Sequence, residues 1–205
     1  MSTAKVAVLF SGGVESTSLL YMYLQRGFLV YPIYIRAGES WERLELQNAV
    51  YLWHYTKKVY KNLKPMRVVS INGKSSFNRS FYRKSELFIP LRNLTLITAA
   101  SMYALQKEIK RLAIGSLGIY PFPDNSIGYI KDVERLISSG SREEFFIEIP
   151  LMGMKKVEVI KRFYDKVPYR LTLSCAMPKK MGRKVLPCGA CIKCREREEA
   201  FSKFL

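Results

Sequence analysis

The chain has 205 residues, of which 48% are hydrophobic and 25% are charged, an ordinary composition for one globular domain. Its longest apolar runs fall short of the roughly eighteen residues that a membrane-spanning helix needs, so the sequence excludes a membrane span. Lysine and arginine number 34 against 17 acidic residues, and the net charge of +17 suits anionic substrates, nucleic acid or a plainly solvated surface. The N-terminus enters a short apolar run at once, which predicts a cytoplasmic protein.

Short apolar runs alternate with helical patterns along the chain. Strands are predicted at 5–10, 29–35, 66–71, 112–115 and 145–149. Helices are predicted over 14–26, between 41 and 55, over 93–107 as a buried helix, and around 157–164. The segment 115–128 is predicted as a loop beyond the fourth strand, where it would touch substrate or form a passive turn. This alternation predicts a Rossmann-like α/β fold, a parallel five-stranded sheet with flanking helices.

A glycine pair follows the first predicted strand. The segment Ser11-Gly12-Gly13-Val14-Glu15-Ser16-Thr17 comes directly after the apolar run 6–10. Two glycines let the backbone approach an anion, and the next helix offers unpaired N–H groups at its positive end. The hydroxyls of Ser11, Ser16 and Thr17 add donors, and Glu15 suits a Mg²⁺ ion that bridges phosphates. Ser-Gly-Gly alone also fits a plain strand-to-helix turn, but the longer pattern predicts a phosphate site that is not a Walker A loop.

Four cysteines gather near the C-terminus. Cys175, Cys188, Cys191 and Cys194 have the spacing C-x12-C-x2-C-x2-C, which can surround one tetrahedral metal ion. Zn²⁺ is the first choice for four thiolates, an iron–sulfur cluster is the second, and disulfides are the remaining alternative. Such a metal would pin the C-terminal helix to the domain, which is a folding role. We therefore expect residues 1–170 to bind nucleotide and residues 171–205 to form a metal knuckle and helix packed on the same domain.

Several segments together resemble one family. The pattern S-G-G-x-x-S-T at 11–17 is similar to the PP-loop of the ATP pyrophosphatase superfamily. Further similar segments are Ile89-Pro90-Leu91-Arg92-Asn93, Ile114-Gly115 with Pro123-Asp124, Pro150-Leu151 with Lys156 and Glu158, and the knuckle Ser174-Cys175 with Cys188 to Arg197. The knuckle is the most specific of them. Across most of its length the chain thus resembles the QueC family of 7-cyano-7-deazaguanine (preQ0) synthases.

This resemblance implies an ATP-dependent ligase that forms C–N bonds. The family converts 7-carboxy-7-deazaguanine and ammonia to the nitrile preQ0 through adenylated intermediates, in the biosynthesis of queuosine and archaeosine in tRNA. ATP, Mg²⁺ and a structural Zn²⁺ are implied, with Ser11 to Thr17, Asn93 and Gly115 at the nucleotide. Arg92 and Lys156 are candidate catalytic cations for the departing pyrophosphate, and Asp124 for the guanine-like N–H edge. The alternative role for Arg92 and Lys156 is a surface ion pair, and the alternative role for Asn93 is to cap its helix.

The chain departs from the family pattern around the expected pocket. Glu15 stands in place of an Asp, Leu173 in place of a Trp, and the stretch Arg36 to Trp41 differs from the usual acidic, aromatic, Gly-Gln and His residues. These departures leave the expected use of ATP intact. They concern the identity of the substrate that ATP activates. The alternatives are a QueC-like paralogue that joins a deazaguanine carboxylate to another amine, a PP-loop enzyme that thiolates tRNA, and a non-catalytic zinc-stapled module that binds nucleotide or RNA.

The expected partners are small molecules, namely ATP, 7-carboxy-7-deazaguanine and ammonia. The resemblance also suggests a homodimer, for which the apolar residues Phe201 and Phe204 suit either an interface or core packing. Direct binding of tRNA is not favoured, because all four cysteines are assigned to metal and the chain leaves no room for an appended RNA-binding domain.

Overall fold

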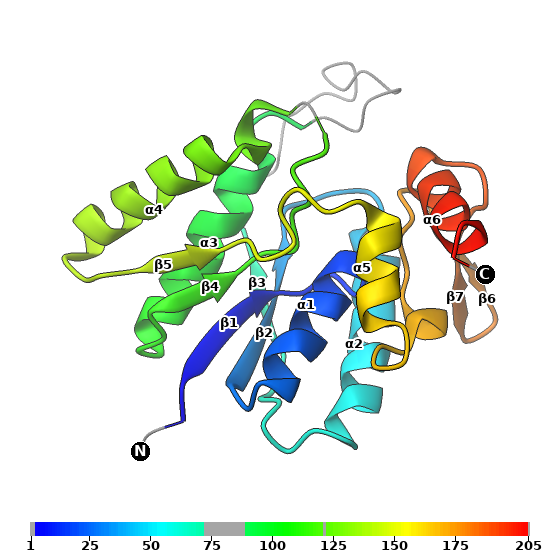
Figure 1. The fold of residues 1–205 in the computed structure, drawn as a ribbon, viewed down its shortest axis with the longest axis horizontal. Coiled ribbons are helices and arrows are strands. Elements are labelled where there is room, and N and C mark those ends of the chain that lie inside the picture. The colour runs from blue at the N-terminus through cyan, green and yellow to red at the C-terminus, as the bar shows by residue number, and fades with distance from the viewer. Residues whose placement is uncertain (1–2, 72–88, 121, 205) are drawn as a thin grey trace.

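The computed structural model describes residues 3–71, 89–120 and 122–204 (Figure 1). The helices and strands are β1 (Lys5–Leu9), α1 (Val14–Gln25), β2 (Leu29–Arg36), α2 (Glu42–Lys57), β3 (Arg67–Ser70), α3 (Arg92–Gln106), β4 (Arg111–Ala113), α4 (Ile127–Ser141), β5 (Phe146–Glu148), α5 (Lys156–Phe163), β6 (Lys179–Met181), β7 (Lys184–Leu186) and α6 (Ile192–Ser202). Single 3-10 turns lie at Pro123–Asn125 and Tyr169–Leu171.

Five parallel strands form the central sheet in the order β3-β2-β1-β4-β5. The middle strand is β1, in which Val8 lies opposite Pro32 of β2 on one side and Ala113 of β4 on the other. Its residues Val6 and Val8 enter one core and Ala7 enters the other, because successive side chains of a strand point to opposite faces. The predicted five-stranded parallel sheet with flanking helices is confirmed.

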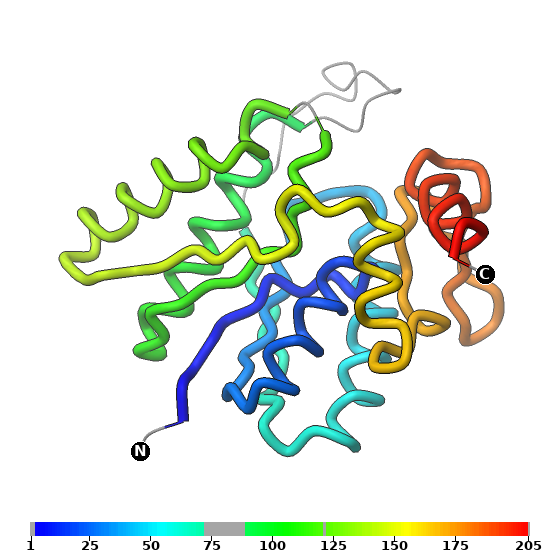
Figure 2. The backbone as a smooth tube through the Cα atoms, viewed as in Figure 1, coloured from blue at the N-terminus to red at the C-terminus, as the bar shows by residue number. Residues whose placement is uncertain are grey.

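Helices cover both faces of this sheet (Figures 1 and 2). Apolar residues of α1, α2 and α5 fill one core, and those of α3 and α4 fill the other. The innermost helix is α1, whose residues from Ser16 to Leu24 are all buried. Two of its polar groups are satisfied there, since the hydroxyl of Ser18 bonds Tyr169 and that of Tyr21 bonds Thr56. This packing fixes the helix that carries the phosphate loop.

Three sequence-based expectations differ from the structure. The predicted loop 115–128 is two residues too long, because α4 begins at Ile127 behind the cap of Ser126, whose hydroxyl accepts the N–H of Tyr129. The prediction of a buried helix at 93–107 is wrong for its outer side, where Met102 is exposed. The excursion between the cysteines, for which no strand was predicted, contains the antiparallel hairpin β6–β7.

The C-terminal segment lies beside α5 (Figure 2). There α5 packs on α1, and α6 packs on α5. Ala200 is buried in the main core, Phe201 meets the ring of Tyr169, and Phe204 meets the ring of Tyr164. The C-terminal helix is therefore joined to the side of the sheet that α1 and α5 cover. Among the helices of the described segments, none is long and apolar enough to span a bilayer.

Candidate nucleotide site and metal knuckle

The phosphate loop turns sharply between β1 and α1. Gly12 has a φ of +78°, and a Cβ on it would lie 3.1 Å from the Cα of Ala49 in α2. Both the left-handed backbone and the close approach of α2 therefore require glycine. Gly13 is the N-cap of α1, so the first amides of this helix face the carboxyl edge of the sheet. This is the arrangement in which a helix start binds an anion.

The hydroxyl groups of the loop differ in their surroundings. The Oγ atoms of Ser11 and Ser16 lie 3.2 Å apart, and both residues line a cavity at the end of the strands. Thr17 is fully buried, and its hydroxyl has no hydrogen-bond partner in the described part of the chain. Gly115, two residues after β4, comes so close that a Cβ on it would lie 3.0 Å from the amide nitrogen of Ser16. The sequence-predicted nucleotide residues Ser11 to Thr17 and Gly115 thus gather at the start of α1, whereas Asn93 lies at the start of α3.

A cavity of about 680 Å³ opens beside this loop. It lies beyond the carboxyl ends of β1, β2 and β4, where ligands bind in open parallel sheets. Its lining includes most of the predicted site residues, namely Ser11, Gly13, Glu15, Ser16, Arg92, Asn93, Gly115, Asp124 and Lys156. Residues separated by more than one hundred positions in the sequence therefore meet in a single space large enough for a nucleotide.

Lys156 sits between two carboxylates at one side of this cavity. Its Nζ lies 3.1 Å from an oxygen of Glu15 in the phosphate loop and 3.4 Å from an oxygen of Glu196 in α6. The lysine side chain is only 10% exposed. Tyr120 donates its hydroxyl to the same oxygen of Glu196. Sequence reasoning identified Glu15 and Lys156 but missed Tyr120 and Glu196.

Arg92, which also lines the cavity, is held by Glu39. Its Nε and Nη2 both donate to this carboxylate, the latter over 3.1 Å, which forms a two-pronged ion pair. The side chain of Glu39 is 9% exposed and that of Arg92 is 32% exposed. The pairing partner comes from the stretch 36–41, where the chain departs from the family pattern. Arg92 therefore faces the cavity with much of its charge already compensated.

Asp124 and Asn93 are bonded to each other. The carboxylate of Asp124 accepts the backbone N–H of Asn93 over 2.9 Å and its side-chain amide over 3.3 Å. Because Asn93 is the second residue of α3, Asp124 caps this helix from the 3-10 turn after β4. Asp124 is buried and keeps acceptor capacity, since an ionised carboxylate has about four lone-pair sites.

Glu45, a further residue of the cavity, was missed from sequence, whereas Trp41 ends the stretch that the sequence analysis placed around the expected pocket. Glu45 of α2 is buried, accepts a 2.9 Å hydrogen bond from the hydroxyl of Tyr34, and has a pKa raised by that burial. The ring of Trp41 lies 5.4 Å from the ammonium of Lys193, a residue of the knuckle helix. The only signal for Glu45 was an acidic residue between the apolar positions Leu44 and Leu46, which a surface helix also shows.

The four cysteine sulfurs form a compact cluster. They all lie within 4.8 Å of one another, and Cys191 is 3.5 Å from Cys194 and 4.0 Å from Cys175. A tetrahedral site with metal–sulfur bonds of about 2.3 Å requires sulfurs about 3.8 Å apart, so the cluster fits a metal ion. The backbone N–H groups of Met177 and Cys188 donate to the sulfur of Cys175. Such donors stabilise thiolates, the form that binds metal.

The surroundings of Cys188 and Cys194 shift the pKa values of their thiols in opposite directions. The backbone N–H of Ala190 lowers the pKa of Cys188 to about 6. Burial instead raises the pKa of Cys194 to about 12. A bound cation would compensate the cost of ionising the buried thiol, because a coordinating thiol is deprotonated by its metal.

The knuckle touches the phosphate loop directly. The N–H of Leu173 donates to the carbonyl of Gly12 over 2.9 Å, and the Oγ of Ser174 accepts the N–H of Val14 over 3.3 Å. Ser174 immediately precedes the metal-ligand candidate Cys175. One hydrogen-bonded segment therefore connects the first turn of α1 to the cysteine cluster.

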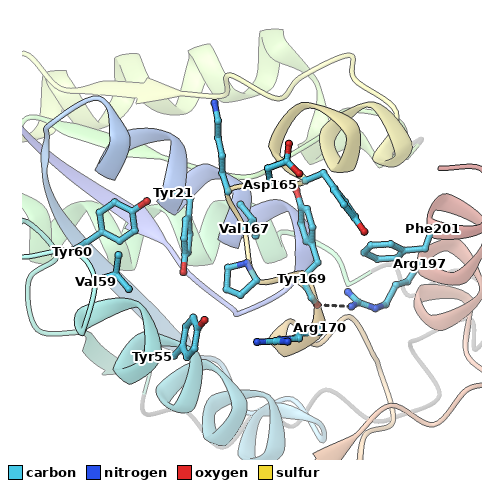
Figure 3. Close-up of a pocket in the computed structure, with 13 residues that line it drawn as sticks. Tyr21, Tyr55, Val59, Tyr60, Asp165, Val167, Tyr169, Arg170, Arg197 and Phe201 are labelled. Atoms are coloured by element: carbon cyan, nitrogen blue, oxygen red, sulfur yellow. Dashed lines mark hydrogen bonds between the residues drawn. The ribbon is translucent and has the colours of Figure 1, made fainter. Parts of the chain in front are cut away.

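A second cavity, of about 660 Å³, lies away from the strand ends (Figure 3). Tyrosines from α1, α2 and the segment after α5 line it, together with Phe201 and the guanidinium of Arg197. That guanidinium donates to the carbonyl of Tyr169 and to the hydroxyl of Thr172, each over 2.7 Å. No residue of the phosphate loop lines this cavity, so the strand-end cavity is the candidate site.

Comparison with known families agrees with this geometry. The family model described as queuosine biosynthesis protein QueC matches residues 5–205. The chain belongs to the QueC family. A relative from Desulfitobacterium hafniense strain Y51, named 7-cyano-7-deazaguanine synthase 1, is 30% identical over 98% of this chain and 92% of its own length. The Aquifex aeolicus strain VF5 protein named 7-cyano-7-deazaguanine synthase is 29% identical over 98% of this chain and 97% of its own.

Two solved structures of other enzymes share the fold of this QueC family member. A 4-thiouridine synthetase in complex with RNA and bound ATP matches with a TM-score of 0.54 at 13% identity, over 98% of this chain and 50% of the other. The U34-tRNA thiolase NcsA from Methanococcus maripaludis, solved with its iron–sulfur cluster, matches with a TM-score of 0.50 at 16% identity, over 82% and 62% of the chains. These similarities show that the QueC chain shares its α/β fold with both enzymes.

Proposed function

We propose that this protein is an ATP-dependent 7-cyano-7-deazaguanine synthase of the cytoplasm. The match to the QueC family over nearly the whole chain carries this proposal. The convergence of the phosphate loop, Arg92, Asp124 and Lys156 on one cavity supports it. The reaction activates 7-carboxy-7-deazaguanine as an acyl-adenylate, which ammonia converts to an amide. A second ATP activates the amide oxygen, and elimination leaves the nitrile.

The phosphate loop is the proposed cradle for ATP. Ser11, Ser16 and the amides at the start of α1 would bind the phosphates, and the carboxylate of Glu15 would help hold Mg²⁺. Lys156, already beside Glu15, would stabilise the charge of the departing pyrophosphate. Thr17 is not proposed to contact ATP, because its buried side chain does not line the cavity. Its proposed role is to support the start of α1 from within the fold.

The acceptor would occupy the part of the cavity near α3. Asp124 can accept the paired N–H groups of a guanine-like ring, and Asn93 holds the carboxylate of Asp124 in place. Arg92 would stabilise charge on the activated acyl group, with Glu39 fixing the plane of its guanidinium. Nucleotide and acceptor would then meet between α1 and α3.

Zinc is the proposed occupant of the knuckle. Four thiolates at tetrahedral spacing favour Zn²⁺, and a single ion matches the sulfur distances. We divide the chain into an ATP-binding part, 1–170, and a knuckle with helix, 171–205, packed on it. Both parts contribute to the proposed site.

A homodimer is the proposed assembly. The outer side of α2 exposes Tyr51 by 59% and Tyr55 by 38%, one helical turn apart, and the turn after this helix exposes Val59 by 67%. Exposed aromatic and apolar groups of this kind are typical of protein interfaces. Phe204 and Phe201 instead pack within the chain. We expect light scattering to give the mass of a dimer and Tyr55→Asp to reduce it, whereas binding to tRNA is not expected at physiological salt.

The test of function is product analysis by mass spectrometry. The protein, loaded with Zn²⁺, is incubated with ATP, Mg²⁺, ammonium and 7-carboxy-7-deazaguanine, and preQ0, AMP and pyrophosphate are measured. We expect the wild-type protein to form nitrile and AMP together. Lys156→Met should form neither product. Lys161→Met, an exposed change on the same helix, should form both as the wild type does. Amide without nitrile would point to the paralogue that uses another amine, and no reaction despite ATP binding would overturn the proposed substrate.

A further inference from the structure

Glu196 makes contacts that its place in the metal knuckle does not require. It lies two residues after Cys194, yet its carboxylate contacts Lys156 and accepts the hydroxyl of Tyr120, both of which line the strand-end cavity. Its side chain is 26% exposed. Tyr120 belongs to the segment between β4 and α4 that lines the strand-end cavity. One carboxylate therefore joins three parts of the site.

The ammonium of Lys156 is shared between two acids. Its distance to Glu15 is 3.1 Å and to Glu196 is 3.4 Å. Glu15 stands at the phosphate loop, where the proposed function needs its carboxylate for a cation. If Glu15 were the lysine's only partner, the position of the ammonium would not be fixed. The long, flexible lysine side chain could move with the Glu15 carboxylate or break the ion pair. Glu196 provides a second anchor on a different element, which fixes the ammonium beside the loop.

We infer that Glu196 is a positioning residue, which holds Lys156 at the phosphate loop and Tyr120 at the cavity wall. Because α6 begins at the cysteine cluster and Arg197 binds it to the carbonyl of Tyr169, the knuckle sets where Glu196 stands. The knuckle then does more than fold the C-terminus, since it supplies a residue to the nucleotide site. This inference rests on the proposed use of ATP.

The test measures binding rather than turnover. The affinity of the zinc-loaded protein for an ATP analogue that cannot be cleaved between the α and β phosphates is measured by calorimetry with Mg²⁺. We expect Glu196→Gln to weaken binding about tenfold, the size of one hydrogen bond to a charged group. Glu196→Asp should recover part of this loss. Glu198→Gln, an exposed change on the same helix, should bind as the wild type does.

A double-mutant cycle separates positioning from a structural effect. Lys156→Met with Glu196→Gln should bind the analogue no more weakly than Lys156→Met alone, because Glu196 acts through the lysine. Additive losses, or wild-type affinity in Glu196→Gln, would overturn the inference. Zinc content and melting temperature are compared for every variant. If Glu196→Gln loses zinc, Tyr120→Phe tests the other contact of this carboxylate in an intact knuckle, and wild-type analogue affinity in that variant would then overturn the inference.

The outcomes also separate this inference from the proposed function. If the wild-type protein binds the analogue but forms no nitrile, the proposed substrate fails while the coupling of Glu196 and Lys156 is still measured. If the wild-type protein does not bind the analogue, the proposed use of ATP itself fails.

Discussion

The phosphate loop and the metal knuckle lie against each other, yet they are held together in different ways. The loop is one continuous segment whose shape follows from backbone geometry, with Gly12 at a φ of +78° and α2 packed against it. The knuckle collects sulfurs from Cys175 and from a turn that starts at Cys188, around a very small core. The first is fixed by the sheet and the main core, whereas the second would depend on the metal ion proposed for it.

This difference teaches where each region is vulnerable. An added methyl group beside the loop is expected to strain the closely packed backbone around it. Most substitutions on the surface of the knuckle are expected to be tolerated as long as its four cysteines remain. The two regions meet at Leu173 and Ser174, which bond to Gly12 and Val14. Damage to the knuckle is therefore expected to reach the loop, and damage to the loop is expected to leave the knuckle intact.

Loss of one thiolate should have the largest effect. We expect Cys191→Ser to lose its zinc and a large part of its stability, because structural zinc supplies folding free energy of about 10 kcal/mol or more in small sites. Affinity for ATP should also fall, because Ser174 and Glu196 would no longer be held at Val14 and Lys156. Metal content by mass spectrometry, melting temperature and calorimetric ATP binding are measured together.

The matched control for this variant is Met181→Ser in the exposed strand β6, which should keep its zinc. Acid should reproduce the effect in the wild type, because each thiol must lose its proton to bind metal and zinc is released as the pH falls. An apo protein with unchanged ATP affinity would break the link between the two regions.

A smaller effect is expected from Gly115→Ala at the loop. The added methyl group would lie 3.0 Å from the amide nitrogen of Ser16 and 3.1 Å from the carbonyl carbon of Glu15. Because both atoms are backbone, the start of α1 must shift, and we expect ATP affinity to fall about tenfold, with a loss of about 1–3 kcal/mol in stability. Zinc content should not change.

Gly128→Ala provides the comparison for Gly115, since no atom lies within 4 Å of a Cβ at this helical position. That variant should be neutral or slightly more stable, as alanine favours a helix. Equal ATP affinities in the two glycine variants would show that the close approach of β4 to α1 is not what shapes the loop.

Much of the fold could be read from the sequence because its signals are local. The five parallel strands are apolar runs, and the helix after the phosphate loop begins where the glycine pair ends. The helix α4 was not predicted from the sequence. Its signals, the N-cap Ser126 and the apolar positions Ile130 and Val133, were passed over because the prolines and asparagine before it indicated a loop. The exposure of α3 was not readable, because an apolar composition does not say which side meets solvent.

The site was readable only in part, for a physical reason. Lys156 and Arg92 were singled out as cations, but their partners Glu196 and Glu39 stand 40 and 53 positions away along the chain. An ion pair of this kind leaves no spacing pattern, because it is made by the packing of α6 on α5 and of the 37–41 segment near α3. The bond between Asp124 and Asn93 was hidden in the same way.

The smallest effect should come from the point where the two regions meet. Ser174→Ala removes the oxygen that accepts the N–H of Val14 over 3.3 Å, a contact of about 1 kcal/mol. We expect ATP affinity to fall roughly threefold to fivefold, since the start of α1 loses one anchor, with zinc content unchanged. The exposed change Ser139→Ala in α4 should have no effect. A fall in zinc affinity without a change in ATP affinity would assign Ser174 to the knuckle instead, and the loop would then be shaped by the sheet alone.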